Sequence, residues 1–263
     1  MDVRIFQKMK KVTFKIANEE EVMKFLLEFS EEEIKNEKFI SLPLDKEMRE
    51  KISKKKLSEK DKKNLKEQIR DFMAKNMPEM KLLLEKVEVF WNKEASSEFF
   101  KEIEIITGKR VDEDFICYMT NIFPGMYFDK YLVTIPYYKK YKEISQEEVL
   151  SEVSFILAEE IFHLIYYDIW KGVFNKNWSL QEIVDRLWYK NDWILWKIGE
   201  IAPQYILIEN PVFKKFGWNK INRIKSYPWI IELKKISDPI WENKKNFADF
   251  IVKIHKAYNC LPE

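Results

Sequence analysis

The alternation of apolar and polar positions predicts a strand and then helices in the first third of the chain. Residues 11–16 (KVTFKI) alternate apolar and charged side chains, the two-residue period of a half-buried strand. Residues 19–29 instead space their apolar side chains as an amphipathic helix does. Residues 45–84 contain no Gly and are rich in Lys, Glu and Leu, which predicts one or two exposed helices with a break near Pro78.

The middle of the chain has the character of a small sheet. Three short runs of β-branched and aromatic residues predict strands: 87–91 (VEVFW), 115–119 (FICYM) and 131–135 (YLVTI). A helix between the first two is expected to begin at a cap on Ser96 or Ser97 and to end at Gly108. Pro124-Gly125 predicts a turn between the last two strands.

The second half of the chain is predicted to be mainly helical. Ser145 and Glu148 have the spacing of a capping box, which begins a long helix. Further helices are predicted at 179–189, 191–208, 219–225 and 243–258, with breaks at Pro211, Pro228 and Pro239. Together these patterns predict an α+β, mainly helical fold, in which a small antiparallel or mixed sheet packs against the long helix. We expect a helical N-terminal extension over residues 1–84 and a second domain over residues 85–263.

Composition narrows the class of protein further. The chain has 263 residues, 46% hydrophobic and 34% charged, which is typical of a globular protein. Its formal net charge of +2 gives no case for a nucleic-acid or membrane partner. The N-terminus lacks the apolar core of a signal peptide, so a cytoplasmic location is expected. Abundant Lys, Glu and Ile with scarce Gln are typical of a thermophile.

A local basic run and the cysteines suggest no further site. Seven Lys between Lys54 and Lys66 stand against two acidic residues, and no aromatic residue is interleaved for base stacking. We therefore expect a solvated helix face there. Cys117 and Cys260 are isolated, so neither a disulfide framework nor a structural zinc site is indicated.

The long helix carries the most informative residues of the chain. Its stretch 156–170 (ILAEEIFHLIYYDIW) is apolar around the whole circumference, which predicts burial. Buried carboxylates are costly unless a partner or a metal compensates them, yet Glu159 and Glu160 lie here. Glu159 and His163 are four residues apart, so their side chains share one face of the helix. The pattern EExxH keeps the geometry of the zinc-binding HExxH helix, with Glu as an acceptable first ligand.

These residues resemble a known class of enzyme. FICYMTNIFPGMYFDKYLVTI followed by VLSEVSFILAEEIFHLIYYDIW resembles the edge strand, loop and active-site helix of gluzincin-type metallopeptidases. The sequence is most similar to predicted metalloprotease-like proteins of archaea and bacteria, over residues 87–207. The resemblance implies a zincin-like fold, Zn held by Glu159, His163 and a later Glu, and Glu160 as general base. Glu200 in WILWKIGEIAPQYIL is the candidate for that later ligand.

The resemblance leaves the activity open because the first His of the motif is Glu159. The chain is expected to be a metal-dependent peptidase-like protein, weakly active or inactive, that takes a peptide or protein. The alternative is a non-catalytic pseudo-metallopeptidase that acts as a binding or scaffold protein. In that case Glu159, Glu160 and His163 form a protein-internal polar cluster without metal.

Other chemistries find less support in the sequence. Residues 160–163 also form an ExxH, but a ferritin-like di-iron site needs a second one, and Val252 stands where His255 would need a Glu. His255 is therefore expected to be a packed or surface residue. Nucleotide-binding glycine motifs and the GxSxG nucleophile motif are absent. Eight of the nine Trp lie from Trp170 onward, and they could form the core or line a peptide or lipid groove.

Overall fold

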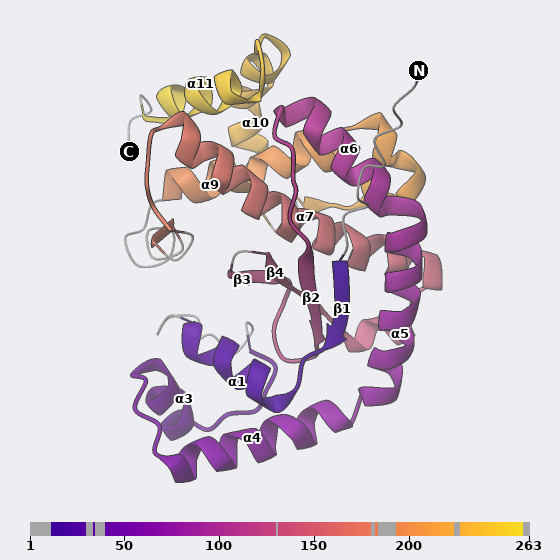
Figure 1. The fold of residues 1–263 in the computed structure, drawn as a ribbon, viewed down its shortest axis with the longest axis vertical. Coiled ribbons are helices and arrows are strands. Elements are labelled where there is room, and N and C mark those ends of the chain that lie inside the picture. Colours follow the sequence, from indigo (N-terminus) through magenta and orange to yellow (C-terminus); the bar gives the residue numbers. More distant parts are fainter. Residues whose placement is uncertain are drawn as a thin grey trace, which may run out of the picture.

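A computed structural model describes residues 12–29, 34, 40–129, 131–179, 182–183, 193–223 and 227–259. In this part the chain is mainly helical, with one small mixed sheet between two groups of helices (Figure 1). The helices are α1 (Glu19–Glu28), α3 (Lys46–Ser53), α4 (Glu59–Ala74), α5 (Met77–Phe90), α6 (Ser96–Thr107), α7 (Gln146–Val173), α9 (Trp193–Pro203), α10 (Ile230–Glu242) and α11 (Phe247–Asn259). None of the helices that the structure describes is long and apolar enough to cross a membrane.

The sheet has four strands in the order β1-β2-β4-β3. Its strands are β1 (Val12–Ile16), β2 (Phe115–Thr120), β3 (Met126–Asp129) and β4 (Leu132–Pro136). β1, β2 and β4 are parallel, whereas β3 is antiparallel to β4 and lies at the edge. The expectation of a small mixed sheet is confirmed, as are the strands at 11–16, 115–119 and 131–135. β3, which follows the turn at Pro124-Gly125, was not predicted.

The first 84 residues contribute to this sheet as well as to helices. β1 pairs with β2, with Phe14 opposite Cys117, and α5 packs on both strands. Val12 is fully buried and Phe14 is 9% exposed, so β1 is part of the core. The boundary between residues 84 and 85 lies inside α5. The division into 1–84 and 85–263 stays a prediction.

The segment predicted as a strand at 87–91 is helical instead. α5 continues through a π-helical turn, η1 (Trp91–Ala95), directly into α6, along one side of the sheet (Figure 1). The strand prediction was wrong because buried Met80, Leu84, Val87 and Trp91 follow the helical period over a longer window. The predicted cap at Ser96 or Ser97 is wrong for the same reason. Gly108, at φ +69°, ends α6 as expected.

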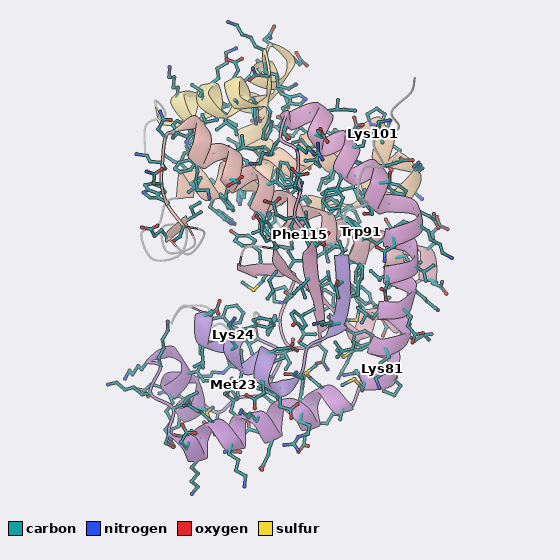
Figure 2. The ribbon with its side chains drawn as sticks, viewed as in Figure 1. Met23, Lys24, Lys81, Trp91, Lys101 and Phe115 are labelled. Carbon is teal, nitrogen blue, oxygen red and sulfur yellow. The ribbon has the colours of Figure 1, made fainter. Side chains whose placement is uncertain are left out.

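Side chains of this continuous helix show how it meets the rest of the molecule. Trp91 is fully buried and packs against the ring of Phe99, while Phe115 of β2 is 1% exposed. Lys81 and Lys101 lie on the solvent side of the same helical rod (Figure 2). One face of the rod therefore covers the core along its whole length.

α7 lies across the sheet and is the central helix of the molecule. The capping box at Ser145 and Glu148 is present as predicted, and the helix packs on β4 and β3 on one side. Its other neighbours include α9 and α11. Burial around its whole circumference, including His163, Tyr166 and Tyr167, confirms the interpretation of its apolar pattern.

The C-terminal half follows the predictions only in part. α9 leads into the π-helical turn η3 (Gln204–Ile208), so the helix at 191–208 is largely confirmed. α10 was not predicted, and Pro239 lies inside it rather than at a break. The predicted helix at 219–225 begins as the 3₁₀ turn η5 (Trp218–Lys220), and residues 224–226 lie outside the described part. Most of the predicted helix at 179–189 also lies outside it.

Candidate metal centre

The structure brings Glu159, His163 and Glu200 together. Glu159 and His163 come from consecutive turns of α7, and Glu200 comes from α9, which packs on α7. One ligand atom of each residue lies within 4.8 Å of the others, the one such group among the described residues. His163 is 3% exposed and Glu200 is 9% exposed. The convergence inferred from the sequence is therefore present.

A glycine on α9 permits this convergence. A Cβ at Gly199 would lie only 3.0 Å from Tyr167 Oη and 3.4 Å from Tyr166 Cε1, both on α7. Such distances are tighter than an ordinary van der Waals contact. The absent side chain at Gly199 thus lets α9 approach α7 closely where Glu200 faces His163.

The imidazole of His163 is in the form that binds metal. Burial lowers the pKa of His163 to about 4, so the ring is neutral at neutral pH. Its Nε2 lies 3.6 Å from Glu200 Oε1, and its Nδ1 is buried without a hydrogen-bond partner. The ring of Tyr167 stacks beside it, and Tyr127 of β3 packs at 6.0 Å between ring centroids.

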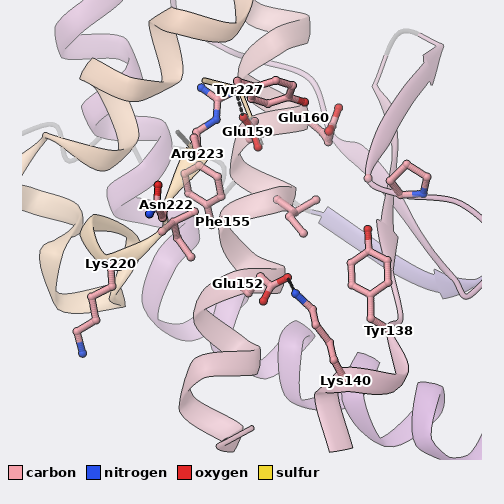
Figure 3. A pocket seen from close by; sticks show the side chains of 14 residues that line it. Tyr138, Lys140, Glu152, Phe155, Glu159, Glu160, Lys220, Asn222, Arg223 and Tyr227 are labelled. Carbon is pink, nitrogen blue, oxygen red and sulfur yellow. Dashed lines mark hydrogen bonds and ion pairs between the residues drawn. The ribbon is translucent and has the colours of Figure 1, made fainter. Parts of the chain in front are cut away.

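Arg223 is the member of the site that the sequence analysis missed. Its guanidinium Nη2 lies 2.6 Å from Glu159 Oε1 and also forms an ion pair with Glu200. Nη1 donates to the backbone carbonyl of Glu200, and the residue is only 5% exposed. Figure 3 shows Arg223 beside Glu159 and Tyr227. The one signal in the sequence was the residue type at position 223, because Arg accounts for only six of the 46 basic residues and the others are Lys.

The three carboxyl groups differ in how well their charge is compensated. Burial raises the pKa of Glu159, Glu160 and Glu200. For Glu159 and Glu200 the positive charge of Arg223 is the main opposing influence on the pKa. For Glu160 the neighbouring Glu159 and Glu200 raise the pKa further, so it lies well above its ordinary value.

A cavity of about 1040 Å³ opens onto the cluster (Figure 3). Its lining consists of Pro124, Gly125, Tyr138, Lys140, Glu152, Phe155, Ile156, Glu159, Glu160, Lys220, Ile221, Asn222, Arg223 and Tyr227. Glu159, Glu160 and Arg223 thus face the cavity, whereas His163 and Glu200 lie behind them. Burial together with the charges of Glu152 and Glu160 raises the pKa of Tyr138 to about 12. The charge of Glu200, followed by burial, raises the pKa of Tyr227.

The donor set fits a divalent transition metal. Two carboxylates and one neutral imidazole are zinc ligands, and Nδ1 of His163 has no hydrogen-bond partner that a metal would have to replace. Ligand atoms around tetrahedral zinc lie roughly 3.4 Å apart. The present 4.8 Å spread would therefore have to close by more than an ångström. Arg223 holds the two carboxylates in the wider arrangement.

The second histidine belongs to a different environment. His255 on α11 accepts a hydrogen bond from Trp170 Nε1 at 2.9 Å and packs against Phe174. This packed position agrees with the expectation for His255. Cys117 is buried in β2, where burial raises the pKa of its thiol well above its ordinary value. Neither residue is part of the cluster.

The basic run at 54–66 lies on α4 and the loop before it. Lys54 pairs with Glu50, Lys62 pairs with Glu59 at 2.6 Å, and Lys66 pairs with Glu20 of α1. These exposed ion pairs are what a solvated helix face provides. No feature of the run points to a ligand.

Comparisons with protein-family models, with curated proteins and with solved structures found no match. The resemblance to gluzincin-type metallopeptidases therefore stays a prediction from the sequence. The function has to be argued from the cluster and the cavity beside it.

Proposed function

We propose that the protein is a metal-dependent peptidase-like protein that binds a divalent transition metal, with zinc as the first candidate. The observation that supports this most directly is that ligand atoms of Glu159, His163 and Glu200 lie within 4.8 Å of one another. Two carboxylate oxygens and one imidazole nitrogen leave a fourth position, which is the arrangement of catalytic zinc sites. The cavity lined by Glu159 adjoins the cluster and is the space in which we expect a substrate to bind.

Bound zinc would polarise a carbonyl group and a water molecule as a Lewis acid. Glu160 faces the same cavity, and burial raises its pKa well above its ordinary value, which makes its carboxylate a stronger base than an exposed one. Tyr138 and Tyr227 line the cavity as protonated phenols, because their pKa values are raised. They can donate hydrogen bonds to the carbonyl oxygens of an extended peptide.

The sheet supports the peptidase part of the proposal. β3 lies at the edge of the sheet and is antiparallel to β4, and both strands pack on α7. The sequence resemblance implies this order of edge strand, loop and active-site helix. Pro124 and Gly125, the last two residues before β3, border the cavity, so the beginning of the edge strand is next to it.

The charge of the site predicts slow hydrolysis. Zinc with two carboxylates and one neutral imidazole is formally neutral, whereas two histidines and one carboxylate leave a net positive charge. The lower charge polarises the bound water less, so its pKa stays higher. We therefore expect peptide hydrolysis at neutral pH to be feeble compared with an HExxH enzyme.

Elemental analysis of untagged protein tests the metal site. We expect close to one equivalent of a transition metal per chain, and its loss in H163A, because the imidazole is the one nitrogen ligand. H255A is the matched control, since His255 is also buried but lies outside the cluster. Equal metal content in H163A and H255A would exclude the proposed ligands.

Arg223 favours a second candidate, a non-catalytic binding protein of the same fold. The guanidinium already compensates both carboxylates, so the cluster can be stable without metal. The cavity would then hold a peptide without cleaving it. A protein that is metal-free as purified, takes up no zinc and is fully folded would support this function over the first.

A further inference from the structure

The guanidinium of Arg223 supplies positive charge to the same two carboxylates that a metal ion would bind. When ionised, Glu159 and Glu200 contribute two negative charges, and His163 is the nitrogen donor of the same group. Arg223 supplies one positive charge, through an Nη2 atom that contacts both carboxylates. Its Nη1 atom donates a hydrogen bond to the backbone carbonyl of Glu200. The residue is thus fixed at the ligands by three contacts.

A metal ion and this guanidinium need the same two carboxylates, although at Glu200 the guanidinium contacts Oε2 whereas Oε1 faces His163. Arg223 Nη2 lies 2.6 Å from Glu159 Oε1, and a zinc ion would bind a carboxylate oxygen at about 2.0–2.2 Å. If both bound at once, three positive charges would surround two carboxylates in a buried site, where charges are poorly screened. A metal can therefore enter only by weakening or replacing the contacts of Arg223.

Mg²⁺ and Ca²⁺ differ from transition-metal ions in the ligands that they would gain by displacing Arg223. Mg²⁺ and Ca²⁺ take six or more oxygen ligands, and this cluster offers carboxylates that are already compensated. Zn²⁺ and related transition metals gain the imidazole nitrogen of His163 in addition. Nδ1 of His163 has no hydrogen-bond partner, and Nε2 faces Glu200 at 3.6 Å, so the imidazole is not held by Arg223.

We propose that Arg223 determines the specificity of the metal site, because its guanidinium competes with the ion for Glu159 and Glu200. This inference rests on the proposed function, since it takes the cluster to be a metal site. Only ions that gain from His163 overcome the competition. Transition metals bind, while Mg²⁺ and Ca²⁺ at cellular concentrations are excluded.

Calorimetric titration of the metal-free, full-length protein with ZnCl₂, MgCl₂ and CaCl₂ tests the inference. In R223Q we expect affinity for Zn²⁺ to rise at least tenfold, and millimolar Mg²⁺ or Ca²⁺ to bind measurably. R223K keeps the charge but lacks the second nitrogen, Nη1, that holds Arg223 on the backbone carbonyl of Glu200, so an intermediate gain of about threefold is expected. R49Q is the matched control. Arg49 is equally buried, but it donates to the carbonyls of Leu44 and Ile34.

A second readout follows the fold rather than the metal. Without Arg223 the two buried carboxylates repel each other, so R223Q in chelator should melt below the parent protein. Added Zn²⁺ should raise its melting temperature by more than it raises that of the parent. R49Q should lose stability without this recovery.

The outcomes separate this inference from the proposed function. Unchanged or weaker Zn²⁺ affinity in R223Q, with metal bound by the parent, would overturn the inference alone. Binding in R223Q but not in the parent would support the inference and overturn the proposed function of the native chain. No binding in either would overturn both. If R223Q does not fold, an R223K affinity equal to that of the parent overturns the inference.

Discussion

Glu160 is the least compensated carboxyl group of the cluster. It lies beside Glu159 on α7 and faces the cavity, and burial raises its pKa well above its ordinary value. Arg223 lowers the pKa of Glu160, but its influence is smaller than the repulsion from Glu159 and Glu200, which raises it. A carboxyl group in this position costs stability whenever it is ionised.

The variant E160Q is expected to stabilise the protein more at pH 8 than at pH 4.5. The folded pKa of Glu160 lies above its unfolded value, so its contribution is fully present below the unfolded pKa and is lost as the pH rises through the folded pKa. Glutamine has no proton to lose. Urea unfolding at both pH values measures the difference.

Glu152 supplies the control for this experiment. It also lines the cavity but pairs with Lys140 at 2.6 Å at the rim. E152Q should change the free energy of unfolding by less than about 1 kcal/mol at either pH. An E160Q effect that is equal at both pH values, or larger at pH 4.5, would contradict the shifted pKa.

At the scale of residues, the sequence identified the carboxylates and the imidazole but not their partner. Glu159 and His163 are related by the helical period, which is local information. Glu200 could be proposed because it interrupts another apolar helix. Arg223 follows an irregular segment, and no periodicity connects it with α7 or α9. Its role depends on tertiary packing alone.

At the scale of elements, the approach of α9 to α7 depends on Gly199. In G199A the new Cβ would crowd Tyr167 Oη and force the helices apart by a few tenths of an ångström. We expect a loss of about 1–3 kcal/mol in the free energy of unfolding. We also expect weaker metal binding, because Glu200 would move away from His163. Denaturant unfolding and zinc titration measure the two effects.

Two further variants check the cause of that loss. Gly172 is also helical, but a Cβ there would meet nothing within 4 Å. G172A should therefore be neutral or stabilise the protein by up to about 1 kcal/mol, from helix propensity. The double variant G199A/Y167F removes the crowded hydroxyl and should recover part of the loss. No recovery would mean that the contact with Tyr167 is not responsible.

Helices with complete end signals were predictable, and short ambiguous runs were not. Ser145 and Glu148 specify the start of α7 locally, as Gly108 specifies the end of α6. Residues 87–91 have β-branched and aromatic side chains, but their burial against the sheet follows the helix that begins at Met77. Pro239 was taken as a break, yet α10 continues through it. In both cases tertiary packing outweighs local preference.

At the scale of the whole molecule, the core is shared by segments far apart in the sequence. β1 completes the sheet at one edge, and its removal would expose the backbone edge of β2 and the apolar surface that Val12 and Phe14 cover. We expect the fragment 85–263 to lack a cooperative unfolding transition, whereas the full chain has one. Circular dichroism during urea unfolding distinguishes them. Cooperative unfolding of 85–263 would establish the predicted boundary as a domain boundary.

Composition and periodicity together gave the fold class, mainly helical with a small mixed sheet, but not the order of its strands. The parallel pairing of β1 with β2 joins residues about a hundred positions apart in the chain. Such a pairing leaves no local mark. The alternation at 11–16 could show a strand, but not its partner.

The π-helical turn η1 also predicts how related sequences align with this chain. Ser96 N–H donates to Trp91 O, five residues back, so the turn contains one residue more than a regular α-helix needs. A single inserted residue accommodated as a bulge leaves the apolar faces of α5 and α6 in phase with the core. Homologous chains are therefore expected to align with this one through a one-residue gap between Trp91 and Ala95. They should keep the spacing of buried positions unchanged on both sides of it.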